Sequence, residues 1–184
     1  MNKNDCQWPG DDLLMRKYHD EEWGVPLHDD GKLFEYMILD AFQAGLSWRT
    51  VLYKRENFRK AFAGFDAEKI ARFSDARIEK LMQDAGIIRN RLKIQATIQN
   101  ARAFLNIREA FGSFDQYIWQ FTDHRTLDTQ RNPGEAPLAT SAQSDAMSKA
   151  LKKQGFRFVG STICYAFMQA SGMVNDHLVT CSRH

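Results

Sequence analysis

Four residues near the two ends of the chain have side chains suited to holding a metal ion. Cys6 and His19 lie near the start, and His177 and Cys181 lie near the end. His177 and Cys181 are four residues apart, so on a helix they would share one face. Zinc prefers thiolate and imidazole ligands, and four of them close a tetrahedral structural site with no open position for water. We therefore predict one structural zinc ion that joins the two termini.

Each cysteine–histidine pair taken alone has a simpler explanation, a buried cysteine and a surface histidine at a chance spacing. The presence of both pairs favours zinc, because Cys164 is then the sole remaining cysteine. Cys164 lies in an apolar run over 162–167, which predicts a core position. A closed set of four ligands argues against a zinc-dependent hydrolase, which needs an open coordination position.

A second group of residues combines aromatic rings with one carboxylate, Asp40. Asp40 lies in an otherwise apolar stretch that predicts a buried helix over 30–42. A carboxylate in that setting needs water, a partner or a ligand, and a helix cap or an exposed helix position would also explain it. Aromatic residues at helical spacing are more often core than pocket. Beside a carboxylate, however, they would suit an electron-poor base extruded from a duplex. The aromatic residues in question are Trp8, Tyr18, Trp23, Phe42 and Trp48.

A third group is basic and follows a predicted turn between two helices. Gly86 lies at that turn, and Arg89, Arg91 and Lys93 follow it at the start of a long helix. A turn that opens onto a helix presents free backbone N–H groups, which bind phosphate without reading sequence. The alternative is an ordinary corner between two helices with solvated basic residues. A further basic run occupies 152–157 and adjoins Gly155.

The elements that carry these groups are predicted to be helical nearly throughout, so we expect an all-α protein. The chain has 184 residues, 43% of them hydrophobic, and a net charge of +2. This length fits a single helical unit over 1–184. Helix caps are predicted at Ser47, Asp66 and Asp75, and 123–139 is predicted to be an exposed loop. The apolar runs are too short to span a membrane, no signal peptide is evident, and three cysteines fit a reducing compartment. We expect a soluble cytoplasmic protein.

Four longer motifs occur along the chain: YHDEEWGVP at 18–26, FQAGLSW at 42–48, DAGIIR at 84–89 and GFRFVGSTICY at 155–165. Together they give a resemblance that covers essentially the whole chain. The chain resembles the 3-methyladenine DNA glycosylase I family of the helix-hairpin-helix superfamily. The resemblance implies a helical glycosylase fold with its helix-hairpin-helix element at about 75–105 and bacterial DNA repair in the cytoplasm. It also implies that Cys6, His19, His177 and Cys181 hold a structural zinc.

The same resemblance implies the residues of the base pocket. The family holds the damaged base with a tyrosine, a tryptophan and an acidic residue, which correspond to Tyr18, Trp48 and Asp40, and Trp8 helps to line the pocket. We assign catalytic roles to Asp40 and Tyr18. The well-known members have glutamate at position 40, whereas this chain has aspartate, which retracts the charge by roughly 1.5 Å. The binding geometry and the range of lesions depend on this difference.

The implied activity is hydrolysis of the N-glycosidic bond of alkylated adenine in double-stranded DNA, by a monomer and without strand cleavage. The family lacks the catalytic aspartate that its relatives carry beyond the hairpin. The sequence agrees, because Glu109 is the sole carboxylate between Arg91 and Phe111. One alternative is a non-catalytic relative that binds damaged DNA and recruits other repair proteins, which the change at Asp40 favours. A zinc-supported protein-interaction domain is another, but it leaves the hairpin and Asp40 without a purpose.

Overall fold

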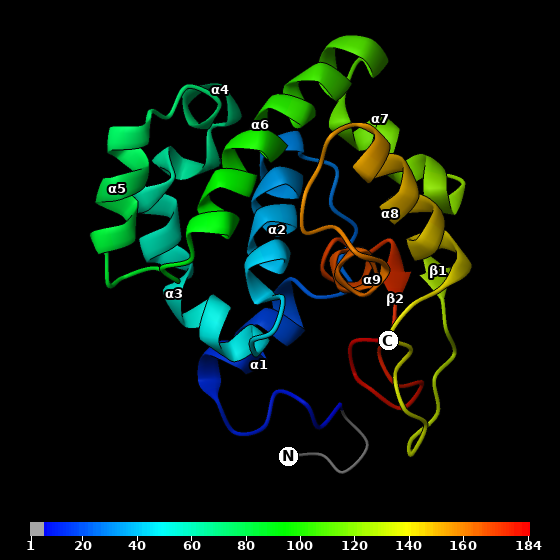
Figure 1. The fold of residues 1–184 in the computed structure, drawn as a ribbon. Coiled ribbons are helices and arrows are strands. Elements are labelled where there is room, and N and C mark those ends of the chain that lie inside the picture. The colour runs from blue at the N-terminus through cyan, green and yellow to red at the C-terminus, as the bar shows by residue number, and fades with distance from the viewer. Residues whose placement is uncertain (1–5) are drawn as a thin grey trace.

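The chain folds into packed helices, as the sequence predicts. The structure is a computed structural model that describes residues 6–184. Within these residues the sole regular elements other than helices are two strands of two residues each, β1 (Leu127–Asp128) and β2 (Val174–Asn175). The helical elements, coloured along the chain in Figure 1, are α1 (Leu13–Glu21), α2 (Asp30–Gln43), α3 (Trp48–Ala61), η1 (Ala63–Phe65), α4 (Ala67–Ile70), α5 (Asp75–Gln83), α6 (Arg91–Phe111), α7 (Phe114–Trp119), η2 (Gln120–Thr122), α8 (Ala142–Lys153) and α9 (Ser161–Ala170).

Polar side chains cap the helices that carry the candidate site. Asp12, Ser47 and Asn90 accept hydrogen bonds from free N–H groups at the starts of α1, α3 and α6. The predicted caps at Ser47 and Asp66 are confirmed. The predicted cap at Asp75 was wrong, because Ser74 caps α5 and Asp75 is its first residue. A carboxylate in the first turn still favours that helix end, since it faces the positive end of the dipole.

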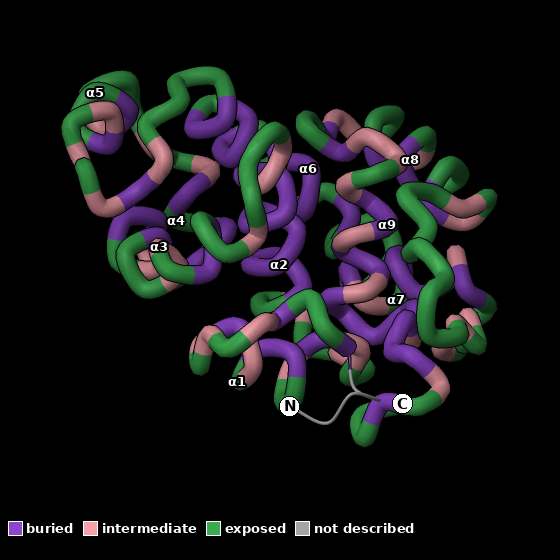
Figure 2. Tube along the Cα trace, turned by 90° about the horizontal axis from the view of Figure 1, so that it is seen from below, coloured by how far each residue is buried: buried purple, intermediate pink, exposed green. Residues whose placement is uncertain are grey.

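Helix α2 is the centre of the fold. Residues 33–42 are all buried, and Figure 2 shows this helix purple among the surrounding elements. Figure 1 places α2 between α6 on one side and α9 on the other. Burial on every side explains why its sequence is apolar all round rather than on one stripe. Asp40 and Glu35 are the two carboxylates within this buried stretch.

The strands correct one prediction about 123–139. This segment is largely exposed, as expected, but it is not entirely a loop. Leu127 and Asp128 pair in parallel with Val174 and Asn175. The pairing fastens the exposed segment to the chain that follows α9, and so brings it to the candidate site. In the part of the chain that the structure describes, no helix has both the length and the apolar character needed to cross a membrane.

Candidate functional site

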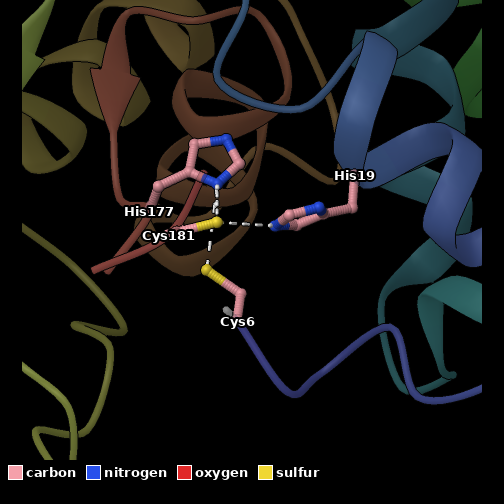
Figure 3. Close-up of side chains that lie close together, drawn as sticks. All are labelled: Cys6, His19, His177 and Cys181. Carbon is pink, nitrogen blue, oxygen red and sulfur yellow. Dashed lines mark hydrogen bonds between the residues drawn. The ribbon is translucent and has the colours of Figure 1, made fainter. Parts of the chain in front are cut away.

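The four predicted metal ligands converge at one buried point. Figure 3 shows Cys6, His19, His177 and Cys181 turned toward one another, and their ligand atoms all lie within 4.8 Å of one another. The sulfur of Cys181 lies 3.7 Å from Nε2 of His19 and 3.6 Å from Nδ1 of His177. The sulfur of Cys6 lies 3.8 Å from the same Nδ1. Zinc bonds of about 2.0–2.3 Å place tetrahedral ligands about 3.3–3.8 Å apart. The group therefore has the donor types and spacing to hold a metal ion.

The ligands come from three separate segments. His19 lies in the last turn of α1, Cys6 precedes that helix, and His177 and Cys181 follow β2. The last two lie on a tight turn rather than on the helix face that their spacing suggested, since the Cys181 N–H donates to the Leu178 carbonyl at 2.8 Å. Either geometry brings residues four apart together. The turn leaves the segment close to the pairing of β1 with β2.

Hydrogen bonds orient both imidazoles toward the sulfur atoms. Nε2 of His177 lies 3.0 Å from the Trp23 carbonyl, so this nitrogen must carry the proton that the carbonyl accepts. The lone pair of Nδ1 then faces the two cysteines. Nδ1 of His19 lies 2.7 Å from the Asp20 carboxylate, which leaves Nε2 to face Cys181. Such outer partners are typical of metal-binding histidines.

Burial determines the protonation states of the histidine and cysteine side chains in the metal-ligand group. It lowers the pKa of His177 to about 4, so the imidazole is neutral and able to act as a ligand at neutral pH. It raises the pKa of the Cys6 thiol to about 11. Thiolates at this position would need a cation to stabilise them. The chemistry of the donors therefore fits a metal ion.

A cavity of about 440 Å³ adjoins the metal-ligand group. Its size lies within the range of small-molecule sites. Its lining is mostly apolar and aromatic, with a few polar side chains among the apolar ones. The lining residues are Cys6, Gln7, Trp8, Tyr18, Trp23, Asp40, Gln43, Trp48, Arg131, Gly134, Pro137, Ala166, Gln169, Asp176 and Leu178. The structure thus brings all four predicted pocket residues, Trp8, Tyr18, Asp40 and Trp48, to one cavity.

Asp40 is the unusual member of the cavity wall. It is 2% exposed, and its Oδ2 has no hydrogen-bond partner in the described part of the chain. Burial alone raises its pKa well above the ordinary range. Nε1 of Trp48 is likewise buried without a partner. An orphaned acceptor and an orphaned donor in one cavity indicate a ligand that satisfies both.

Aromatic contacts connect this cavity to the metal-ligand group. Trp8 lies 5.1 Å from Trp23 and 6.3 Å from Tyr18, and Tyr18 lies 4.9 Å from Trp48, measured between ring centroids. Trp23 also meets the His177 ring at 4.6 Å. Movement of the terminal segments would therefore move the cavity wall. Tyr18 is fully buried, and burial raises the pKa of its phenol well above the ordinary value, so it stays protonated.

Several lining residues were missed from the sequence. Asp176 lies 3.3 Å from the Arg131 guanidinium, and its other oxygen accepts a 2.6 Å hydrogen bond from Gln169. Gln43 also lines the cavity, one turn beyond Asp40. No periodic pattern marks these positions, because they come from four separate places: the end of α2, the exposed segment, α9 and the chain after β2. The one sequence signal for Asp176 and Gln43 was their position next to residues already singled out, since Asp176 precedes His177 and Gln43 follows Phe42.

The structure separates the four residues predicted to contact a DNA backbone. Gly86 lies in the turn before α6, where its N–H donates to Asp84 at 2.8 Å, and Arg89 is exposed nearby. Arg91 is exposed and paired with Glu79 of α5. Lys93 differs from the solvent-facing position that was expected. It is buried, and its ammonium donates to the carbonyls of Phe42 at 2.8 Å and Ala44 at 2.6 Å.

Comparison with known proteins accounts for this arrangement. The model of the family described as methyladenine glycosylase matches residues 8–184. The chain belongs to the methyladenine glycosylase family. The resemblance found in the sequence motifs is thereby confirmed.

Relatives within the methyladenine glycosylase family match along almost their whole length. DNA-3-methyladenine glycosylase 1 of Escherichia coli (strain K12) is 55% identical over 96% of this chain and 94% of its own. DNA-3-methyladenine glycosylase of Haemophilus influenzae is 45% identical over 96% and 95%.

Solved structures of the methyladenine glycosylase family confirm the all-α fold. A crystal structure of 3-methyladenine DNA glycosylase I has a TM-score of 0.95 at 50% identity, and the match covers 98% of this chain and 99% of that one. The Staphylococcus aureus enzyme, described for its recognition of 3-methyladenine, has a TM-score of 0.94 at 33% identity and covers 98% and 96%.

Proposed function

We propose that this protein is a DNA-3-methyladenine glycosylase, which extrudes alkylated adenine from duplex DNA and hydrolyses its N-glycosidic bond to begin base excision repair. Relatives in its family bear that name over almost the whole of their chains. The observation that carries the proposal is the buried, unpartnered carboxylate of Asp40 in an aromatic cavity. A cationic flat base supplies the positive charge, the hydrogen-bond donors and the π-faces that this cavity is built to receive.

Methylation at ring nitrogen 3 makes adenine a cationic leaving group. Water adds to the anomeric carbon of the deoxyribose as the bond from that carbon to the base nitrogen breaks. The bonding electron pair passes to the base, which leaves as neutral 3-methyladenine, and the attacking water loses a proton to solvent. The enzyme therefore need not protonate the base. The reaction therefore needs no carboxylate in the turn before α6 or in most of that helix, and 85–108 contains no Asp or Glu.

Asp40 has the main catalytic role in this proposal. Its carboxyl is held in the cavity at a high pKa, so a cationic base stabilises the ionised form that the empty cavity disfavours. Tyr18 contributes its ring and a protonated hydroxyl, and Trp48 and Trp8 contribute stacking faces. The shorter reach of aspartate requires the base to sit deeper than it would against glutamate, or a water molecule to bridge the two. Either arrangement leaves the hydrolysis of the N-glycosidic bond unchanged.

The proposed metal is one structural zinc ion held by Cys6, His19, His177 and Cys181. When bound it would supply a cross-link between the chain termini, with no coordination position open for substrate. The residues themselves position the cavity: Trp23 lies between the His177 ring and Trp8. Loss of the cross-link would therefore loosen one wall of the cavity.

The partner in this proposal is double-stranded DNA containing alkylated bases. Gly86, Arg89 and Arg91 lie at or beside the turn before α6, where free backbone N–H groups and charge would meet phosphates. Lys93 would act indirectly, because its ammonium holds the end of α2 that carries Asp40 and Gln43. One chain contains the whole cavity, so we propose a monomer that works on the chromosome in the bacterial cytoplasm.

Mass spectrometry of released bases tests the proposal. Purified protein is incubated with duplex DNA treated with a methylating agent, beside a control without enzyme because these lesions also depurinate spontaneously. Release of 3-methyladenine above the control supports the glycosylase, and its loss in Asp40→Asn supports the role of the carboxylate. A folded, zinc-loaded protein that binds lesion DNA but releases no base would instead be a damaged-DNA-binding relative.

A further inference from the structure

The carboxylate of Asp12 joins two helices that each contribute a ring to the cavity. Asp12 directly precedes α1, and its side chain is 3% exposed. Its Oδ1 accepts hydrogen bonds from the backbone N–H groups of Leu14 at 2.9 Å and Met15 at 3.1 Å, which caps α1. Its Oδ2 accepts hydrogen bonds from two side chains of α3, from Nε of Arg49 at 2.7 Å and from the Tyr53 hydroxyl at 2.9 Å. One oxygen therefore serves each helix.

Capping of α1 accounts for only one of these two oxygens. An N-cap residue needs a single acceptor, and asparagine or serine supplies it as well as aspartate. Arg49 has 62% of its side chain exposed, and Tyr53 is exposed as well, so burial of apolar surface does not bring them to Asp12. An ion pair with such a partner stabilises a fold little, because water screens the charge and ordering a long side chain costs entropy. Neither capping nor stability explains the contacts of Asp12 with α3.

The link to Asp12 acts on the first turn of α3, which begins at Trp48. The N–H groups of a first turn have no acceptors within the helix, so a helix frays there most easily. Gly45, three residues before Trp48, has a φ of +77°, a conformation that lets the chain turn sharply. Arg49 directly follows Trp48. Its hydrogen bond to Asp12 therefore fixes the turn that carries the Trp48 ring.

Helix α1 carries the ring that faces Trp48. Tyr18 lies 4.9 Å from Trp48 between ring centroids, and the two ring planes are inclined by 45°. Glu22 fixes the other end of α1 to the same partner helix, since Arg55 of α3 donates to its two oxygens at 2.5 Å and 2.8 Å. Figure 1 shows α1 and α3 meeting where α2 ends. Helix α1 is thus held to α3 on both sides of Tyr18.

We propose that Asp12 is a positioning residue for the alkylated base, because it holds Trp48 at a fixed separation and angle from Tyr18. The inference rests on the proposed function for its ligand. Nε1 of Trp48 is buried without a hydrogen-bond partner in the described part of the chain, so no bond of its own orients this ring. Asp12 supplies the constraint through Arg49. Such preorganisation raises affinity, because less ordering remains to be done when the base binds.

Asp12→Asn tests the proposal, because asparagine still caps α1 but lacks the negative charge that Arg49 contacts. The melting temperature should stay close to that of the wild type. Binding of free 3-methyladenine, measured by calorimetry, should weaken about tenfold if the competent arrangement of the rings falls to about a tenth of the population. Arg49→Gln should weaken binding by a similar factor, and the double variant should weaken it no further. The free base has no phosphate, so the assay is blind to any contact of Arg49 with DNA.

Asp66→Asn is the matched control for the change of charge. Asp66 caps α4 through Oδ1, and its Oδ2 pairs with Lys69 at 3.0 Å, so both oxygens are used as they are in Asp12. Within the described part of the chain, no residue of α4 lines the cavity. Asp66→Asn should therefore leave the affinity for 3-methyladenine unchanged.

Wild-type affinity for the free base in Asp12→Asn would overturn the proposal. Additive losses in the double variant would also overturn it, since Asp12 and Arg49 would then act separately. A lower melting temperature in Asp12→Asn, with full base affinity in Arg49→Gln, would show that Asp12 is only a cap. Failure of the proposed function is distinct from these outcomes, because the wild type itself would then neither bind 3-methyladenine nor release it from DNA.

Discussion

Gly172 is the position where one added methyl group should do most damage to the site. It follows α9 with φ of +69°, and a Cβ built there would lie 2.3 Å from the Pro26 nitrogen and 2.3 Å from the Val25 carbonyl carbon. Both contacts are to backbone, which cannot rotate away. Hydrogen bonds from the Gly24 N–H to the Gln169 carbonyl and from the Leu27 N–H to the Ser171 carbonyl hold the two segments together here.

The expected cost of Gly172→Ala has two parts. Forcing an L side chain into the left-handed region costs about 1–2 kcal/mol. Overpacking against an immobile backbone adds about 1–3 kcal/mol. The sum is about 2–5 kcal/mol, which lowers the melting temperature of a chain of this size by roughly 4–20 °C. The matched control is Gly64→Ala, where φ is +68° but nothing lies within 4 Å of the added Cβ, so about 1–2 kcal/mol is expected.

Denaturant unfolding and thermal melting of both variants check this reasoning. Gly172→Ala should also weaken metal binding and base release, because Val25 and Pro26 lie just after Trp23, whose carbonyl accepts the hydrogen bond from His177. Gly64→Ala is exposed and remote, so it should change neither. Equal losses of stability in the two variants would refute the steric part of the argument. Full metal affinity in Gly172→Ala would refute the link between this backbone contact and the ligand group.

Three further results are expected from the site itself. Removal of metal by a chelator should lower the melting temperature and loosen the terminal segments, whereas loss of base release at an unchanged melting temperature would point to a catalytic metal. Asp40→Asn should lose base release and yet be more stable than the wild type at neutral pH. The pKa of Asp40 is raised on folding, so the stability of the wild type falls as pH rises above the unfolded pKa, and the advantage of the variant should grow from pH 4.5 to 7.5 in urea unfolding. An advantage that shrinks with pH would contradict this. Trp48→Ala should weaken binding of free 3-methyladenine by about 1–3 kcal/mol in calorimetry, and unchanged affinity would show that this ring does not stack on the base.

Much of the fold follows from local sequence signals. The apolar stretch of α2, the cap at Ser47 and the long α6 after Gly86 are each encoded by residues close together in the chain. Helix formation depends on hydrogen bonds within a few residues, so periodicity and caps predict it. The pairing of β1 with β2 was missed because two-residue strands have no period to detect, and their partners are 47 residues apart.

The candidate site was likewise predicted in part from the sequence and decided in part by the tertiary structure. Residue types and motifs were enough to predict that Cys6, His19, His177 and Cys181 form one group that could hold a metal ion. They also marked Asp40 as an unusual carboxylate, since a charge in an apolar helix has few stable explanations. Tertiary structure decided where each group faces. It brought the four predicted ligands together, left Oδ2 of Asp40 without a hydrogen-bond partner among the described residues, and turned Lys93 inward to two carbonyls. Those outcomes depend on contacts between distant segments, which chain spacing alone does not encode.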